Sequence, residues 1–264
     1  MDSRLELARE AALEAGRLVM GYFQEEYEIR EKGKGNPVTT ADLEADGALH
    51  RILMEGAPGT EWLSEETVDS PARLEAEEVW IVDPIDGTKE FIMGIPEFAI
   101  SIGLAVAGEM HLGAIYNPAR QEMFLAERGG GAWLNGERAR VSERTDLHGS
   151  TLHASRSEAK RGEFERYRES FEVLPVGSIA YKLAQVAAGR ADLTWSLGPK
   201  NEWDIAAGVV LIQEAGGRVT EPRGAPFRFN RARTKVPGIL ATNGRLHDLA
   251  LQEVEPDLSE RSRR

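Results

Sequence analysis

The sequence predicts a mixed α/β (α+β) fold, in which amphipathic helices pack against sheets that include antiparallel strands. Apolar residues recur every three or four positions between residues 3 and 24, which is the spacing of one helix face. Large apolar residues alternate with small ones between residues 98 and 106, which is the period of a strand. The pattern changes near residue 145. We therefore expect two halves that share an interface, residues 1–145 and 146–264, within the chain of 264 residues.

The first predicted element is a helix over residues 3–24. It begins with Ser3-Arg4-Leu5-Glu6, which has the composition of a capping box. The polar, glycine-rich segment of residues 31–37 follows, and we expect it to be a mobile loop. Its lysines either stay solvated or close over an anion.

A second helix is expected over residues 41–55. Thr39-Thr40-Ala41-Asp42 forms another capping box at its start, so Asp42 has a sufficient structural reason to be present. After this helix, Glu65 and Glu66 directly follow a short apolar run. Adjacent glutamates are usually exposed, and this pair alone would indicate no site.

The most informative stretch begins with four large apolar residues, 79–82, which are typical of a strand buried on both faces. Asp83-Pro84 is expected to end the strand, because proline cannot donate to a ladder. Asp86 follows three residues after Asp83, and Gly87-Thr88 leads into a possible helix. Buried carboxylates need a counter-charge or a metal ion, and oxygen-only ligands favour Mg²⁺. The alternative is a turn in which these residues serve only backbone geometry.

The remaining elements of the first half form an antiparallel meander. Its strands are expected at residues 98–106, 110–116, 123–126 and 131–134, the last of them entering an Asn135-Gly136 turn. In the second half we expect strands at 151–154, 171–176, 191–195 and 239–242, and helices at 158–170, 178–188, 204–215 and 245–254. Asp204 would open its helix as a favourable first-turn acid. The tail, residues 259–264, is expected to fray.

The composition excludes several functional classes. No apolar run approaches the ~20 residues of a membrane span, and we see no secretory signal. The chain has no cysteine, which fits a reducing cytoplasm, and its five histidines lack the spacing of zinc ligands. A net charge of −12 argues against binding a nucleic-acid polymer. It would also repel an anionic substrate unless local cations reverse the field.

Three acidic motifs occur in a specific order, namely Glu65-Glu66, Asp83-Pro84-Ile85-Asp86-Gly87-Thr88 and Trp203-Asp204. In order and spacing the chain resembles the inositol monophosphatase superfamily over nearly its whole length. The resemblance implies a layered αβαβα sandwich and Mg²⁺-dependent hydrolysis of phosphate monoesters. It further implies two or three Mg²⁺ per chain, inhibition by Li⁺, and often a homodimer.

The resemblance also implies roles for individual residues. The metal-binding groups would be the side chains of Glu65, Asp83, Asp86 and Asp204 and the carbonyl of Ile85. Most of these ligands lie in the first half, whereas Asp204 lies in the second. Glu66 would stand behind the ligands, and Thr88, with Asp42 or Glu65, would orient the attacking water. The N–H groups of Gly87 and Thr88 would hold phosphate oxygens. No phospho-enzyme is expected.

The substrate is suggested by smaller motifs. Lys89-Glu90-Phe91, Ser155-Arg156-Ser157 and the loop before Asp204 resemble the 3′(2′),5′-bisphosphate nucleotidase branch. Lys182 matches that branch's lysine near the second phosphate, although an exposed helix lysine is the alternative. Residues 179–181 lack the branch's usual serine pair. The preferred substrate is 3′-phosphoadenosine-5′-phosphate. The alternatives are an inositol-phosphate or broader sugar-phosphate phosphatase and, more remotely, a non-catalytic metal or phosphate sensor.

Overall fold

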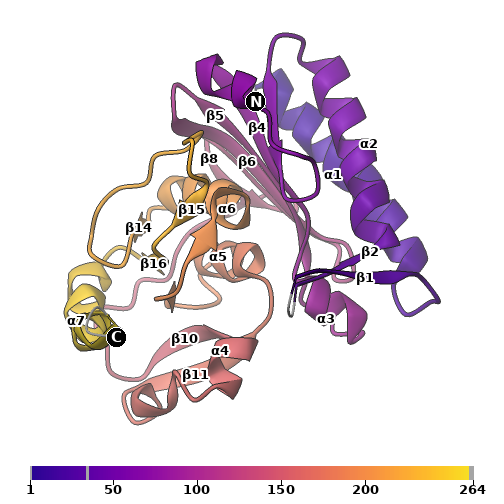
Figure 1. Ribbon diagram of the computed structural model, residues 1–264. Coiled ribbons are helices and arrows are strands. Elements are labelled where there is room, and N and C mark those ends of the chain that lie inside the picture. Colours follow the sequence, from indigo (N-terminus) through magenta and orange to yellow (C-terminus); the bar gives the residue numbers. More distant parts are fainter. Residues whose placement is uncertain (1, 34–35, 262–264) are drawn as a thin grey trace.

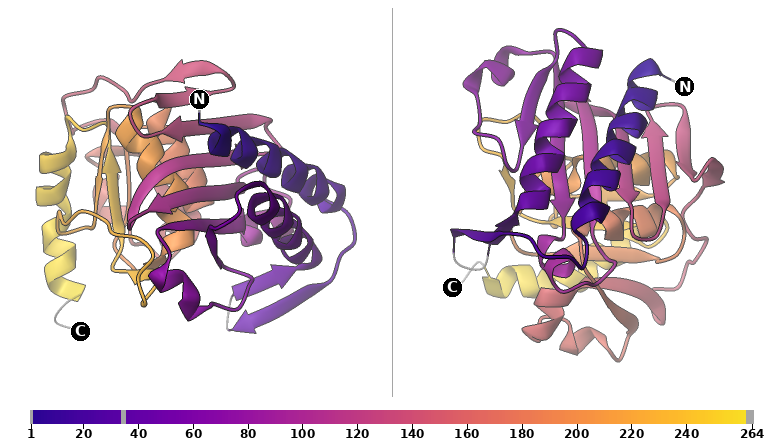
Figure 2. Two further views of the ribbon diagram at one scale, coloured as in Figure 1. Left: turned by 90° about the horizontal axis from the view of Figure 1, so that it is seen from above. Right: turned by 90° about the vertical axis from the view of Figure 1, so that its right-hand side faces the viewer.

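The protein is built of five layers in the order α, β, α, β, α, which are seen edge-on in Figure 2. The computed structural model describes residues 2–33 and 36–261. The outer helices α1 (Ser3–Tyr22) and α2 (Thr40–Gly56) cover one face of a large sheet. Helices α5 (Ile179–Ala187) and α6 (Glu202–Glu214) fill the space between the two main sheets, and α7 (His247–Arg261) covers the far face of the second sheet. The mixed α/β fold class and its αβαβα layering are confirmed.

The first sheet has seven strands in sequence order. They are β3 (Glu61–Ser64), β4 (Glu78–Asp86), β5 (Ala99–Val106), β6 (Glu109–Asn117), β7 (Glu122–Glu127), β8 (Gly131–Leu134) and β9 (Glu137–Ala139). β3 and β4 are parallel, and the neighbours from β4 to β9 are antiparallel, so the predicted meander is confirmed.

The second sheet has five strands in the order β11-β10-β12-β16-β14. Their bounds are β10 (Ser150–Ser155), β11 (Phe171–Val176), β12 (Leu193–Ser196), β14 (Arg218–Thr220) and β16 (Ile239–Thr242). The short elements are the pairs β1 (Ile29–Gly33) with β2 (Asn36–Thr39) and β13 (Lys200–Asn201) with β15 (Lys235–Val236), the helices α3 (Thr88–Ile92) and α4 (Arg156–Lys160), and the 3₁₀ turns η1 (Pro71–Glu75) and η2 (Glu165–Tyr167).

Glycines in the first sheet let α6 approach it closely. A β-carbon at Gly113 would stand 2.8 Å from the carbonyl oxygen of Ala207, and one at Gly103 would stand 3.2 Å from Cβ of Ala206. Side chains at these strand positions would push the helix outward. One hydrophobic cluster therefore continues from Ile81 and Ile115 of the first sheet through α6 to Ile239 of the second. The division near residue 145 stays a prediction.

Several predicted boundaries were wrong. Asp2, whose side chain accepts a hydrogen bond from the N–H of Arg4, is the N-cap of α1, so Ser3 does not form a capping box. The expected mobile loop at 31–37 contains parts of the hairpin β1–β2, while Lys34 and Gly35 lie outside the described residues. β4 does not end at Asp83-Pro84, because pairing with β5 resumes at Asp86 after an irregularity.

The second half needed more corrections. The helix expected at 158–170 is divided into α4 and η2, since Gly162 adopts a φ of 81° that ends the first turn. α6 begins before Asp204, with Asn201 as its N-cap. α7 continues past Pro256 to Arg261, because Val254 and Leu258 remain packed in a buried hydrophobic cluster with Trp195 and Leu240. Residues 259–261 are thus helical, and residues 262–264 lie outside the described part. The strands β14 and β15 were not predicted.

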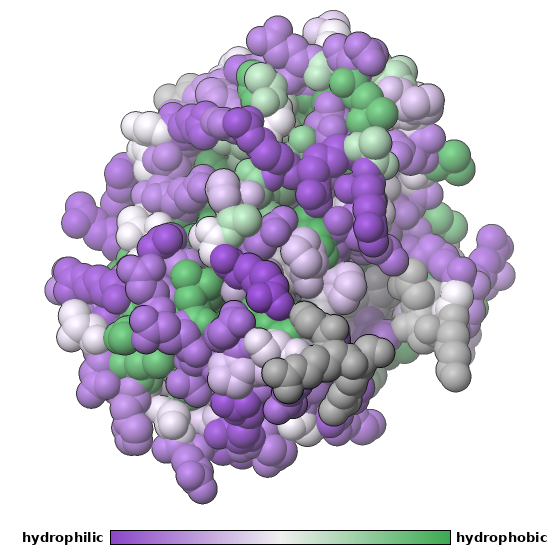
Figure 3. Space-filling model, turned by 60° about the vertical axis from the view of Figure 1, so that its left-hand side comes forward, coloured by the Kyte–Doolittle hydropathy of each residue, from purple (hydrophilic) through white to green (hydrophobic). Residues whose placement is uncertain are grey.

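The surface agrees with the composition. Hydrophilic residues cover most of the face in Figure 3, and hydrophobic side chains form small separate patches there. Within the described ranges, every helix is too short or too polar to span a lipid bilayer.

Candidate active site and metal centre

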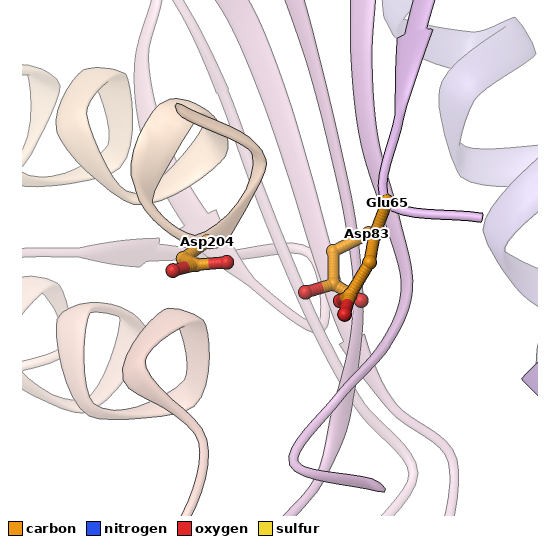
Figure 4. A group of neighbouring side chains, drawn as sticks. All are labelled: Glu65, Asp83 and Asp204. Atoms are coloured by element: carbon orange, nitrogen blue, oxygen red, sulfur yellow. The ribbon is translucent and has the colours of Figure 1, made fainter. Parts of the chain in front are cut away.

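Three carboxylates from three separate elements meet at one end of the first sheet. β3 and β4 run parallel with Ser64 opposite Val82, so the next residues along the two strands, Glu65 and Asp83, lie side by side. Asp204 reaches the same point from the first turn of α6. One oxygen of each carboxylate of Glu65, Asp83 and Asp204 lies within 4.8 Å of the other two. Figure 4 shows the three side chains. We call these three residues the carboxylate triad.

The triad concentrates negative charge in a buried place. Asp83 is only 2% exposed. Burial, followed by the charges of Glu65, Asp86 and Asp204, raises the pKa of Asp83 well above its usual range. Burial and the charge of Asp86 raise the pKa of Asp204 to about 7. Like charges this close need a cation between them, and a donor set made only of carboxylate oxygens fits Mg²⁺.

Asp86 lies near the carboxylate triad, but its side chain is directed to the start of α5. Its Oδ2 accepts hydrogen bonds from the Ser178 hydroxyl and the Ala180 N–H, both at 2.5 Å. These bonds connect the end of β4 to the first turn of α5. Burial still raises the pKa of Asp86 in spite of them. The structure thus brings Asp86 beside the carboxylate triad, although its Oδ2 already has two protein donors.

Thr88 and Asp42 form a second functional unit. The Thr88 hydroxyl lies 3.0 Å from Oδ1 of Asp42 and 3.1 Å from the carbonyl oxygen of Ile85. The other Asp42 oxygen accepts from both the N–H and the hydroxyl of Thr39, which confirms the predicted capping box. Burial raises the pKa of Asp42, and these hydrogen bonds oppose the rise. Gly87, with a φ of 99°, makes the left-handed turn that starts α3 at Thr88.

Glu66 lies behind Glu65 and shares a cation with it. The Lys32 ammonium, on β1, lies 2.8 Å from Oε1 of Glu65 and 2.7 Å from Oε1 of Glu66. The Glu66 side chain is only 4% exposed, and burial raises its pKa to about 7 although the contact with Lys32 lowers it. Lys32 therefore contacts carboxylates rather than remaining solvated.

A pocket of about 440 Å³ extends from the carboxylate triad and Thr88 to two lysines, Lys182 and Lys200. Lys182 is 2% exposed on its floor, and burial lowers the pKa of its ammonium to about 8. This overturns the alternative that Lys182 is an exposed helix residue. Lys200 also lines the pocket and lies 3.2 Å from Oε1 of Glu158, which accepts a further hydrogen bond from Ser196. This end of the pocket therefore holds two ammonium groups, with the carboxylates of Glu158, Asp86 and Glu90 acting on Lys182.

Sequence reasoning missed several of these groups. Lys32 and Lys200 were seen only as parts of loops, and their contacts join residues 33 and 42 positions apart in the chain. Ser178, which holds Asp86, lies 92 residues from it. The one available signal for Ser178 was its place at the start of a predicted helix, where serine is a common N-cap.

The chain is similar to known proteins over nearly its whole length. The model of the inositol monophosphatase family matches residues 1–258. The chain belongs to this family. The inositol-1-monophosphatase of Mesorhizobium japonicum is 36% identical over 262 residues, covering 96% of each chain. Among solved structures, the IMPase of Thermotoga maritima has a TM-score of 0.87 at 32% identity, covering 98% of this chain and 99% of its own.

A second solved structure is also similar to this chain. CysQ from Bacteroides thetaiotaomicron, described as a bacterial member of the inositol monophosphatase family, has a TM-score of 0.77 at 28% identity. The match covers 92% of this chain and 97% of CysQ. The predicted family is therefore confirmed. As a phosphatase of the inositol monophosphatase family, the protein is a phosphoric monoester hydrolase, and the family depends on metal ions.

Proposed function

We propose that the protein is a Mg²⁺-dependent 3′(2′),5′-bisphosphate nucleotidase that removes the 3′-phosphate of 3′-phosphoadenosine-5′-phosphate. The observation that carries this proposal is that one pocket contains both the carboxylate triad and a buried lysine end. The first feature suits a metal-assisted phosphoryl transfer, and the second suits a further anionic group on the substrate.

The metal site would be formed by the triad with Asp86 and the Ile85 carbonyl. Two or three Mg²⁺ bound there would neutralise the phosphate oxygens, activate water and stabilise the leaving oxygen. Glu66 and Lys32 would hold Glu65 in place from behind.

Thr88 would orient the attacking water. Its hydroxyl has one proton, which it donates to Asp42 or to the Ile85 carbonyl. The hydroxyl oxygen then keeps lone pairs that can accept a hydrogen bond from water. Asp42 is fixed by both Thr39 donors, so it keeps Thr88 in this orientation. The N–H groups of Gly87 and Thr88 would bind phosphate oxygens, where the absence of a β-carbon permits close approach.

The second phosphate would bind at the lysine end. The hydrogen bonds found among the described residues include none to the Lys182 ammonium, whereas Lys200 already contacts Glu158. A buried ammonium without a hydrogen-bond acceptor favours an anionic ligand. The 5′-phosphate of the nucleotide would supply that ligand.

Inositol 1-phosphate is the second candidate substrate, together with other sugar phosphates. It is favoured by the relatives, since the protein from Mesorhizobium japonicum carries the name inositol-1-monophosphatase. Residues 179–181 are Ile179, Ala180 and Tyr181, so Ser178 is the one serine beside Lys182 that could bind a nucleotide.

Parallel assays with Mg²⁺ distinguish the candidates. We expect the highest kcat/KM for 3′-phosphoadenosine-5′-phosphate among that nucleotide, inositol 1-phosphate and fructose 1,6-bisphosphate. A clear preference for either sugar phosphate would reject the nucleotide proposal. Asp83→Asn should abolish nearly all turnover, and full activity in that variant would contradict the metal assignment. The homodimer, the cytoplasmic location and inhibition by Li⁺ stay predictions.

A further inference from the structure

Glu90 is a buried acid that lines the same pocket as the carboxylate triad. It lies on α3, two residues after Thr88, is 9% exposed, and lines the pocket. Among the hydrogen bonds between residues of the described part of the chain, none joins the Glu90 carboxylate to another side chain. Its own backbone N–H is the donor to this carboxylate among residues 2–33 and 36–261. Buried polar groups normally have partners, so this carboxylate is an acceptor available to a ligand.

Gly177 makes room for the Glu90 side chain. A β-carbon at residue 177 would collide with Cγ and Cδ of Glu90, so the absence of a side chain makes room for the glutamate. Gly177 is itself fixed, because its N–H donates to Oε2 of Glu97 at 2.7 Å, and Arg156 contacts the same oxygen. The backbone against which the Glu90 side chain packs is therefore fixed by hydrogen bonding.

Two other uses of a carboxylate at this site suit Glu90 less well. It is not a member of the carboxylate triad, and it cannot accept a hydrogen bond from an ionised phosphate, which has no proton to donate. A sugar hydroxyl is a suitable donor. Lys182 and Arg156 act on Glu90 electrostatically and offset the charge of nearby Asp86.

We infer that Glu90 accepts a hydrogen bond from a hydroxyl group on the sugar ring of the substrate. The identity of that hydroxyl rests on the proposed function. In 3′-phosphoadenosine-5′-phosphate both other ribose hydroxyls are phosphorylated, so the 2′-hydroxyl, next to the scissile phosphate, is the donor. Glu90 is thus a specificity-determining residue for ribose over deoxyribose.

A cycle that combines an enzyme variant with a substrate analogue tests this inference. kcat/KM is measured for wild type, Glu90→Gln and Glu90→Ala with the bisphosphate nucleotide and with its 2′-deoxy analogue. A hydrogen bond to a charged group contributes a factor of about 10 to 100, so wild type should prefer the ribose substrate by about tenfold or more. Glu90→Ala should lose that preference, and Glu90→Gln, whose amide oxygen still accepts, should keep part of it.

The matched control is Glu97→Gln. Glu97 does not line the pocket, and the amide oxygen of glutamine can still accept from the Gly177 N–H, so this variant should keep the preference for the ribose form. Thermal unfolding of each variant verifies that it is folded. A purely structural role for Glu90 would slow both substrates equally.

Two results would overturn the inference. One is a wild type that does not distinguish the two nucleotides, and the other is a Glu90→Ala variant that still prefers the ribose form. If the nucleotide is not hydrolysed but inositol 1-phosphate is, the proposed function fails separately. The same cycle is then run with monodeoxy inositol phosphates. At least one analogue must be discriminated by wild type and not by Glu90→Ala, and the absence of such an analogue would refute the role of Glu90.

Discussion

Replacing Asp204 with asparagine should make the metal-free protein more stable while removing its function. The Oδ2 atom of Asp204 accepts a hydrogen bond from the Asn201 N–H at 2.8 Å, and the amide oxygen of asparagine can keep this bond. The substitution preserves shape and removes one of the negative charges gathered with Glu65 and Asp83. Its main effect on the metal-free protein is therefore electrostatic.

The magnitude follows from the pKa of Asp204, which is raised from 3.8 to about 7, chiefly by burial. The folded state binds this proton more tightly than the unfolded state, so the free energy of unfolding falls as the pH rises from about 4 to 7. A shift of about three pKa units corresponds to about 4 kcal/mol, which is fully lost above pH 7. Because Asp83 and Asp86 share protons with this cluster, we expect Asp204→Asn to recover about 2–4 kcal/mol at pH 8.

The assay is urea unfolding in EDTA at pH 5 and pH 8, repeated with saturating Mg²⁺. Wild type should lose stability between the two pH values in EDTA and regain it with Mg²⁺, whereas Asp204→Asn should change less in both comparisons. Asp248→Asn is the matched control. Asp248 is an exposed first-turn acid paired with Arg218, and such surface pairs contribute about 1 kcal/mol or less.

The outcome that refutes this reasoning is clear. If Asp204→Asn is less stable than wild type in EDTA at pH 8, the Asp204 carboxylate is not an electrostatic burden in the metal-free protein. If Mg²⁺ stabilises the variant as much as wild type, Asp204 does not belong to the metal site.

Three further predictions concern other residues. Lys182→Met should lower kcat/KM for 3′-phosphoadenosine-5′-phosphate by roughly tenfold to a hundredfold in steady-state assays, with little change for inositol 1-phosphate, and equal losses would contradict its proposed role. Thr88→Val should lower kcat by about a hundredfold or more in the same assays while the thermal midpoint changes by only a few degrees, and a kcat within twofold of wild type would exclude Thr88 as the water-orienting group. His247 is fully buried between Thr220 and Thr242, and burial lowers its pKa to about 4. The unfolded state therefore binds more protons between pH 6.5 and 4, so stability should fall there by up to about 3 kcal/mol as the pH drops, and urea unfolding of His247→Gln should not show this component.

Local sequence chemistry predicted the parts of the site that lie close together in the chain. The capping box at Thr39 and Asp42 requires only a spacing of three residues, and it is present. The buried strand at residues 79–82 was clear from its apolar run, and Asp83 follows it directly in the last part of β4. The meander was likewise predicted because hairpin turns connect strands that are neighbours in sequence.

Long-range contacts could not be predicted in this way. The contact of Lys32 with Glu66 depends on the hairpin β1–β2, whose polar, glycine-rich sequence favoured a loop. Asp86 is directed to Ser178 by the packing of α5 against the first sheet, and no periodicity in the sequence encodes that pairing. In the sequence, Glu90 was noticed only as part of the Lys89-Glu90-Phe91 motif. Its buried position depends on the room left by Gly177, which is far from it in the chain.

The central claim is that residues distant in the chain bind shared metal ions. The most direct test is an anomalous difference map from crystals soaked in Mn²⁺, a cation that accepts the same oxygen ligands as Mg²⁺. We predict strong peaks between the carboxylates of Glu65, Asp83 and Asp204, with Asp86 at their edge. A map without a peak there, from crystals of an enzyme that is active with Mn²⁺, would contradict the account.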